Sequence, residues 1–315
     1  MKSKILAVVG PTASGKTGLA IELAKAYNGE VVSADSMQIY KGMTIATAKP
    51  SEQEMQEIPH HLIDFLDADK TYSVGQYVID AEKAVSDIIS RDKLPILCGG
   101  TGLYVDSFLN GIDFIDNSSN DVIRKDLELM AEEKGVDFML EKLASFDPTS
   151  AEKLEEQKNL KRIIRAIEFY MVTGITISEQ NEKSRLINSK YEHIIIGLTA
   201  SDRQYLYDRI NKRVDRMIEQ GLVEEAREVL SSSLSDTSSK AIGYKQLIPY
   251  FNGTEELEAC VERIKMETRR YAKRQLTWFK RNENIIWINI DEFNTDADIA
   301  QYAKKIISDR GFLNG

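Results

Sequence analysis

A glycine-containing run near the start of the chain, GPTASGKT at residues 10–17, constrains its fold and chemistry more than any other feature. It follows an apolar segment, Ile5–Val9, and precedes a helical pattern from Gly18 to Ala26. The G-x-x-x-x-G-K-[ST] phosphate-binding motif requires this strand–loop–helix context. In such a loop, successive backbone N–H groups and the N-terminus of the next helix point at a bound anion. The predicted diphosphate- or triphosphate-binding residues are Gly10, Pro11, Thr12, Ala13, Ser14, Gly15, Lys16 and Thr17.

Two side chains of this run have expected roles of their own. The Lys16 ammonium adds a mobile positive charge, and the Thr17 hydroxyl is placed to bind Mg²⁺. Cys98 and Cys260 show neither metal-ligand nor disulfide spacing, so we expect both to be buried thiols. The motif does not identify the organic group on the phosphates, because kinases, nucleoside triphosphatases and other transferases share it.

The composition indicates a soluble globular protein. Of the 315 residues, 42% are hydrophobic and 29% are charged, which is ordinary for this class. No apolar run approaches the roughly 18 residues of a membrane span, and no signal-peptide pattern precedes the first strand. We therefore expect a cytoplasmic monomer with reduced cysteines and no membrane partner. The formal net charge of −9 argues only weakly against nucleic-acid binding, because a basic face can lie on an acidic protein.

Strands and helices alternate along the first hundred residues. Apolar segments at Ile5–Val9, Glu30–Ser33 and Leu94–Cys98 predict strands, and helical patterns at residues 17–27 and 75–90 lie between them. Because the segments lack polar alternation, they are typical of a parallel sheet covered on both faces. The predicted fold class is α/β, a P-loop NTPase-like doubly wound parallel sheet.

The pattern changes after residue 113, where helical periodicity continues to about residue 189 without a convincing strand. A core strand is expected to return at residues 192–198. The predicted core domain therefore comprises residues 1–112 and 190–315, and residues 113–189 form an inserted helical subdomain. The later segments predict helices at residues 203–220, 223–230, 257–281 and 296–308, a strand at 284–290, and a mobile serine-rich loop at 231–239.

Polar residues follow the second and third predicted strands. Asp35 follows the second, and Gly99–Thr101 follows the third. Because open α/β sheets bind ligands at the carboxyl ends of their strands, both join the phosphate loop at one crevice. Asp35 has two functional interpretations, a Mg²⁺ ligand or a general base, and one structural interpretation, a helix N-cap or turn residue. Thr101 is expected to be an N-cap whose hydroxyl faces the crevice, and His60 and His61 are interpreted as loop residues or indirect substrate contacts.

Three predicted helices carry clustered basic residues. For each cluster, a solvent-exposed helix face is the structural alternative to a phosphate contact. An arginine that reaches the phosphate crevice would neutralise leaving-group charge. In the helix at 257–281, the aromatic residues Tyr271, Trp278 and Phe279 are interpreted as core contacts. The clusters on the other two helices are Lys158, Lys161, Arg162 and Arg165, and Arg209, Lys212, Arg213 and Arg216.

The motifs, in this order and spacing, resemble those of the bacterial tRNA dimethylallyltransferase family across nearly the whole chain. Two departures are Ala46, where the family more often has glycine, and an Asn-Ser-Ser-Asn run at 117–120 in place of a proline-rich turn. The C-terminal zinc finger of eukaryotic relatives is absent. The blocks that carry the resemblance are residues 10–17, 35–50, 59–64, 99–104, 161–174, 209–225, 241–247 and 269–280.

The resemblance implies that a dimethylallyl group passes from dimethylallyl diphosphate to N6 of the adenosine 3′ of the anticodon, in tRNAs that read codons beginning with U. Asp35 would be the general base, supported by Thr101, and Arg213 would stabilise the departing diphosphate together with Lys16 and Mg²⁺ on Thr17. The tRNA anticodon stem-loop would contact the insertion and the pocket. The implied tRNA-binding residues are Asp35, Ser36, Met37, Gln38, Thr101, Arg124, Lys161, Arg162, Ile163, Ile164 and Arg165.

Three other functions stay open at the level of sequence. A P-loop small-molecule kinase using ATP shares the loop, although no clear metal-binding aspartate follows a second hydrophobic strand. A prenyltransferase acting on free adenylate would have no use for basic inserted helices. A non-catalytic, nucleotide-gated RNA-binding protein would not need the carboxylate of Asp35.

Overall fold

The computed structural model describes residues 2–112, 120–186 and 189–313, and the side chains of all of these except residues 183–186. Residues 117–119 of the Asn-Ser-Ser-Asn run lie outside the described residues. The chain divides into two compact units, Met1–Leu109 with Lys190–Gly315, and Asn110–Ser189. The insertion therefore begins three residues before the predicted boundary at 113.

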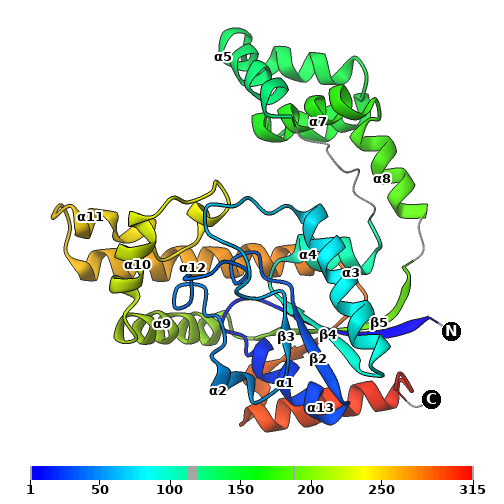
Figure 1. The fold of residues 1–315 in the computed structure, drawn as a ribbon, viewed down its shortest axis with the longest axis vertical. Helices are drawn as coiled ribbons and strands as arrows, with labels where there is room; N and C mark the ends of the chain where they lie inside the picture. Colours follow the sequence, from blue (N-terminus) through cyan, green and yellow to red (C-terminus); the bar gives the residue numbers. More distant parts are fainter. Residues whose placement is uncertain (1, 113–119, 187–188, 314–315) are drawn as a thin grey trace. The chain divides into compact units, whose positions relative to one another are not determined.

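A six-stranded sheet, with every strand pair parallel, forms the centre of the first unit (Figure 1). The strand order is β3-β2-β4-β1-β5-β6, and the predicted α/β fold class is confirmed. β1 lies between β4 and β5, and open α/β sheets bind ligands where the strand order reverses in this way. The strands are β1 Ser3–Val9, β2 Gly29–Ser33, β3 His60–His61, β4 Leu94–Gly99, β5 Tyr191–Thr199 and β6 Ile285–Asn289.

Helices cover both faces of this sheet, which explains its apolar strands. Successive strand residues point to opposite faces. Leu6 and Val8 of β1 join a buried cluster with residues of α1 and α13, so Ile5 and Ala7 must face the other side, where α3 packs on β2 and β4. The helices of this unit are α1 Lys16–Ala26, α2 Glu52–Met55, α3 Val74–Ser90, α4 Gly102–Leu109, α9 Arg203–Glu219, α10 Leu222–Ser231, α11 Ile248–Phe251, α12 Leu257–Phe279 and α13 Asp296–Asp309.

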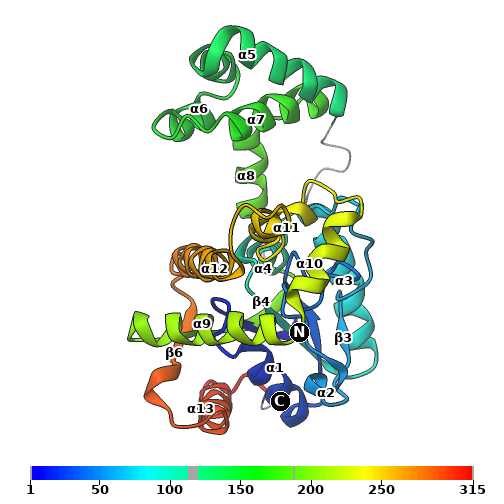
Figure 2. The same ribbon diagram turned by 90° about the vertical axis from the view of Figure 1, so that its left-hand side faces the viewer.

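The second unit is helical over its described residues, and Figure 2 shows its elements from a second side. Gly135 interrupts α5 with non-helical backbone angles (φ 81°, ψ 170°). The unit has its own buried core, in which Leu127 and Met139 of α5 pack with Ile163 and Ile167 of α7. Its helices are α5 Asp121–Ala144, α6 Pro148–Glu155, α7 Leu160–Thr173 and α8 Ile177–Leu186.

Two segments expected to be loops are held by contacts that the sequence did not indicate. His60 and His61 form β3, which pairs in parallel with Val31 and Val32 of β2; two residues are too few to show a strand period in a sequence. The serine-rich loop is also fastened, because the Ser238 hydroxyl donates a hydrogen bond of 2.6 Å to the carbonyl oxygen of Ala68 and Ser238 is fully buried.

A buried carboxylate holds the β3 edge of the sheet. Glu30 on β2 is 1% exposed, and both its carboxylate oxygens accept hydrogen bonds from the Arg91 guanidinium. The carboxylate also binds the Lys93 ammonium at 2.8 Å and the His61 ring nitrogen Nε2 at 2.7 Å. These partners come from the chain segments next to β4 and from β3, so one side chain connects three strands. The Arg91 hydrogen bonds, followed by those of Lys93 and His61, hold the pKa of Glu30 well below its usual value.

We predict that Glu30→Gln lowers the free energy of unfolding by about 2 kcal/mol, because a buried carboxylate is lost while its cations remain. Asp87→Asn is the matched control, since Asp87 is an exposed carboxylate on the same Arg91, and it should change stability by less than about 0.5 kcal/mol. Urea unfolding of both variants measures the difference. Equal effects of the two substitutions would show that Glu30 has no special role.

Candidate active site

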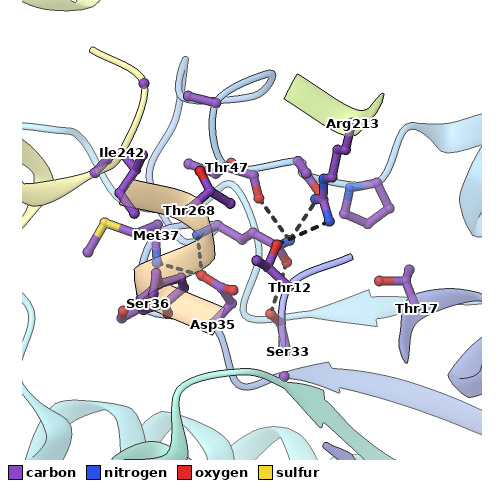
Figure 3. Close-up of a pocket in the computed structure, with 18 of the residues that line it drawn as sticks. Thr12, Thr17, Ser33, Asp35, Ser36, Met37, Thr47, Arg213, Ile242 and Thr268 are labelled. Carbon is purple, nitrogen blue, oxygen red and sulfur yellow. Dashed lines mark hydrogen bonds between the residues drawn. The ribbon is translucent and has the colours of Figure 1, made fainter. Parts of the chain in front are cut away.

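A cavity of about 360 Å³ lies at the carboxyl ends of the strands. The register aligns Val9 of β1 with Gly99 of β4, and Ser33 of β2 with Cys98 of β4. The three loops that follow these strands therefore open at the same edge of the sheet. Both polar and apolar side chains line the cavity, and Figure 3 shows several of them. The polar side chains include Thr12, Lys16, Thr17, Asp35 and Arg213, and the apolar side chains include Val214, Met217, Leu222, Ile242 and Ile264.

The loop between β1 and α1 has the backbone geometry that an anion site needs. Gly10 has a φ of 144°, and a Cβ atom there would lie 2.5 Å from the carbonyl oxygen of Leu198. Gly15 has a φ of 92° and occupies the N-cap of α1, where no side chain satisfies the first N–H groups. Those groups stay available to a ligand, and the helix dipole favours a negative charge beside them.

Lys16 and two arginines of α9 surround this loop. The Lys16 ammonium donates a hydrogen bond of 2.6 Å to the carbonyl oxygen of Pro11. Arg209 Nε donates to the carbonyl oxygen of Ala13 at 2.9 Å, and Arg213 Nη1 donates to the Thr12 hydroxyl at 3.3 Å. Burial lowers the pKa of Lys16 to about 8, and Arg213 adds to this effect. Burial also lowers the pKa of Arg213. The structure thus brings Arg213 to the crevice that the sequence assigned to it.

Asp35 is a turn residue, as one interpretation of the sequence predicted, and it uses one carboxylate oxygen for this role. Its Oδ1 accepts hydrogen bonds from the backbone N–H groups of Met37 at 2.9 Å and Gln38 at 3.3 Å. Among the described residues, Oδ2 has no hydrogen-bond partner. The turn therefore fixes the carboxyl group at the cavity wall and leaves its second oxygen for a ligand. Ser36, Met37 and Gln38 line the same cavity.

Thr101 stands just before α4 and is not among the described residues that line the cavity. Its hydroxyl oxygen accepts a hydrogen bond from the Ser36 N–H at 3.0 Å and lies 3.3 Å from the Ser36 hydroxyl. The Tyr271 hydroxyl also hydrogen-bonds the Thr101 side chain, and burial raises the pKa of this tyrosine. Thr101 stands at the predicted helix start, and its side chain is used to join two loops rather than to cap α4.

Helix α12 contributes residues that sequence analysis missed. The Gln275 side chain accepts a hydrogen bond from the Thr12 N–H at 2.9 Å and donates one to the Gly100 carbonyl oxygen at 3.0 Å. It is 5% exposed and fastens the phosphate loop to the loop after β4. Ile264, Thr268 and Tyr271 line the cavity one turn apart on the same face. This spacing was the available signal, but it also fits a core stripe, and Tyr271 was interpreted as a core contact.

A metal ion at this site would take most of its coordinating oxygens from the bound substrate and water. Among the residues the structure describes, no group of three or more histidine, cysteine, aspartate and glutamate side chains could hold a metal. The Thr17 hydroxyl lines the cavity at the phosphate loop. Mg²⁺ commonly binds through one or two protein oxygens, waters and substrate phosphates, which this lining fits. Both cysteines are buried and unpaired, as predicted.

In the helical unit, the side chains of two residues predicted to contact RNA are buried in the core. Ile163 and Ile164 are 0% and 5% exposed, because they form the apolar face of α7 in the core. Arg124 and Arg165 both pair with the buried carboxylate of Glu168, at 3.0 Å and 3.2 Å. Lys161 and Arg162 are exposed on the opposite side of α7. No helix in the described part of the chain is both long and apolar enough to cross a membrane.

The chain is similar to known proteins over nearly its whole length. A family model described as IPP transferase matches residues 38–282. A tRNA dimethylallyltransferase of Acetivibrio thermocellus is 47% identical over 98% of this chain and 99% of that protein, and one of Bacillus cytotoxicus is 45% identical over 96% and 95%.

Solved structures agree with these relatives. The full-length tRNA isopentenylpyrophosphate transferase of Bacillus halodurans has 39% identity and a TM-score of 0.71, with 99% of both chains covered. A eukaryotic dimethylallyltransferase acting on tRNA has 29% identity and a TM-score of 0.83, with 99% of this chain and 80% of that chain covered.

The lowered pKa of Lys16 predicts how anion binding depends on pH. Since the free protein loses the Lys16 proton as the pH rises through about 8, the Kd for inorganic pyrophosphate should rise up to about tenfold for each pH unit above that value. Isothermal titration between pH 7 and 9.5 measures it, with Lys16→Met as the control. The protonation of pyrophosphate itself affects both proteins equally, so it cancels in the ratio of their Kd values. A ratio that does not change with pH would contradict the prediction.

Proposed function

We propose that this chain, which belongs to the IPP transferase family, transfers the dimethylallyl group of dimethylallyl diphosphate to tRNA. The acceptor is N6 of the adenosine 3′ of the anticodon, in tRNAs that read codons beginning with U. One observation carries the proposal: a phosphate-binding loop, the carboxylate of Asp35 and several apolar side chains, among them Leu222 and Ile242, line the same cavity. This combination suits an allylic diphosphate better than a nucleoside triphosphate, because the apolar side chains can cover the hydrocarbon chain.

The phosphate loop and its cations act on the leaving group. Backbone N–H groups at the start of α1 would hold the diphosphate, and Lys16 and Arg213, which contact Pro11 and Thr12 of the loop, would supply positive charge beside it. In the reaction, the bond between C1 of the dimethylallyl group and the diphosphate oxygen breaks, and the electron pair leaves with the diphosphate. Fixed cations that meet this growing charge lower the barrier without reorganisation.

Thr17 is the residue that would hold Mg²⁺ together with the diphosphate oxygens and water. The hydroxyl lies at the second position of α1, beside the predicted diphosphate site. Bound Mg²⁺ supplies additional positive charge to the leaving diphosphate.

Asp35 acts on the acceptor. As N6 forms its bond to C1 of the dimethylallyl group, one N6 proton passes to Asp35 Oδ2, the oxygen that the turn leaves available. The proton balance is then complete, with diphosphate and alkylated adenosine as products. Thr101 contacts Ser36 and thereby fixes the loop that carries Asp35, the proposed general base. The target adenosine must leave its stack to reach this depth, as enzymes that act on base atoms require.

Among the basic residues of the helical unit that were predicted to bind tRNA, Lys161 and Arg162 are the best candidates for contacts with the phosphates of the anticodon stem. Both are exposed at the N-terminal end of α7, whereas Arg124 and Arg165 already share Glu168. Lysine and arginine side chains on RNA phosphates supply affinity that falls with salt.

We predict that the protein transfers label from radioactive dimethylallyl diphosphate to unmodified tRNA with an A-A-A run in its anticodon loop, with Mg²⁺ and without ATP. Asp35→Asn should lower the rate of transfer by about 10² to 10⁴-fold, the usual contribution of a general base, and leave pyrophosphate affinity unchanged, because the amide oxygen can keep the turn. Label on AMP instead of tRNA would identify an adenylate prenyltransferase. ATP hydrolysis without any label transfer would favour the kinase or nucleoside triphosphatase interpretation.

We predict that the double variant Lys161→Ala with Arg162→Ala raises the KM for tRNA by about tenfold and lowers the slope of log affinity against log salt by about one to two. The matched control replaces two exposed lysines of the same unit, Lys125 and Lys153, by alanine. Steady-state kinetics across a salt series compares the two proteins. Equal increases in KM for both double variants would mean that only the net charge matters and that Lys161 and Arg162 do not contact the stem.

A further inference from the structure

A single carboxylate on α10 collects four hydrogen bonds outside the groups that act on substrate. Glu225 Oε2 accepts from the backbone N–H groups of Thr44 at 2.9 Å and Ile45 at 2.7 Å. Oε1 accepts from the Ala46 N–H at 2.9 Å and from the Tyr244 hydroxyl at 3.0 Å. Three consecutive backbone donors thus converge on one side chain from a segment about 180 residues away.

The segment that Glu225 binds is a closed turn. The Thr47 hydroxyl donates to the Met43 carbonyl oxygen at 2.6 Å, and the Lys49 N–H donates to the Thr44 carbonyl oxygen at 3.0 Å. Successive N–H groups that point to one side of such a turn form an anion-binding concavity. Here the protein fills the concavity with its own carboxylate, and hydrogen bonds to a charged acceptor are stronger than those between neutral groups.

This clamp connects two walls of the cavity. Ala46, Thr47 and Ala48 belong to one wall, and residues 241–243 belong to a second, adjacent wall. The two walls touch, since a Cβ atom on Gly243 would lie 3.0 Å from the Ala46 Cβ. In Figure 3, Thr47 and Ile242 lie away from Thr17. Glu225 holds one wall through backbone N–H groups and the other through Tyr244.

The clamp also reaches the loop of the proposed base. The Gln38 amide nitrogen donates to the carbonyl oxygens of Thr47 at 3.3 Å and Ala48 at 3.1 Å. The Gln38 N–H is in turn a donor to Asp35. A continuous series of hydrogen bonds therefore leads from Glu225, through the turn at 44–48, to Asp35. None of these contacts involves the phosphate loop.

We propose that Glu225 is a positioning residue that sets the distance between the two cavity walls and so orients the acceptor adenosine and the dimethylallyl chain. This inference rests on the proposed function. Glu225 would act on the reaction only through the turn at 44–48 and Tyr244, without touching the substrate. Its loss should impair the use of tRNA while leaving diphosphate binding intact.

The test compares Glu225→Gln with Glu224→Gln. Glu224 is the exposed neighbour on the same helix, so both variants lose one charge. A glutamine at 225 offers one acceptor oxygen in place of two and directs an NH₂ group at backbone donors. We expect kcat/KM for tRNA to fall by at least about tenfold in Glu225→Gln, with the Kd for inorganic pyrophosphate close to that of Glu224→Gln and a melting temperature only a few degrees lower, because the turn loses part of its support.

Two further measurements separate positioning from general damage. Amide hydrogen exchange at Thr44, Ile45 and Ala46 should become faster in Glu225→Gln and stay unchanged in Glu224→Gln. Tyr244→Phe removes one of the four hydrogen bonds and keeps the carboxylate, so it should reduce kcat/KM for tRNA in the same direction by a smaller factor.

Wild-type kcat/KM in Glu225→Gln, or a parallel loss of pyrophosphate binding, would overturn the proposal, as would unchanged exchange at residues 44–46. If the wild-type protein transfers no label to tRNA, the proposed function fails. The exchange experiment, which needs no substrate, then still decides whether Glu225 holds the turn.

Discussion

The parallel pairing of β2, β4 and β1 is the constraint on which the site depends. Parallel strands in register end at one edge of a sheet, and here Ser33, Gly99 and Val9 stand at nearly the same level. The loops that follow them contribute Asp35, Thr101 and the phosphate-binding residues. No side chain could assemble these groups if β4 did not lie between the other two strands, since the three loops are far apart along the chain.

Two helices between β5 and β6, α9 and α12, add contacts to the loops at the strand ends. Gln275 of α12 joins the phosphate loop to the loop after β4, and Arg209 and Arg213 of α9 hold the phosphate loop from outside. Lys16 and Arg213 donate hydrogen bonds to a carbonyl and a hydroxyl oxygen, and no direct contact with a carboxylate is found for either among the described residues. Partly buried cations that no carboxylate contacts cost stability, and they keep the site ready for an anionic ligand.

The hydrogen bonds around the cavity form two groups with different partners. One group includes Lys16, Arg213 and Gln275 and concerns the phosphate loop. The other runs from Glu225 through the turn at 44–48 to Gln38 and concerns the walls around the proposed acceptor. Separate supports of this kind would let the proposed leaving group and acceptor be held independently, in loops that both extend from the same edge of the sheet.

The sequence by itself determined the α/β class, the phosphate loop and the helical insertion, because each has a local signature: an apolar run, a glycine spacing or a helical period. It also identified Asp35, Thr101 and Arg213 as candidates, the first two from their place after strands. Only the tertiary structure decided how Gln275, Tyr271 and Glu225 contribute, because their partners lie on segments distant in sequence. It also showed that Ile163 and Ile164 pack inside the helical unit. A local pattern records which residues share a helix face, and only packing decides whether that face meets a core, a ligand or solvent.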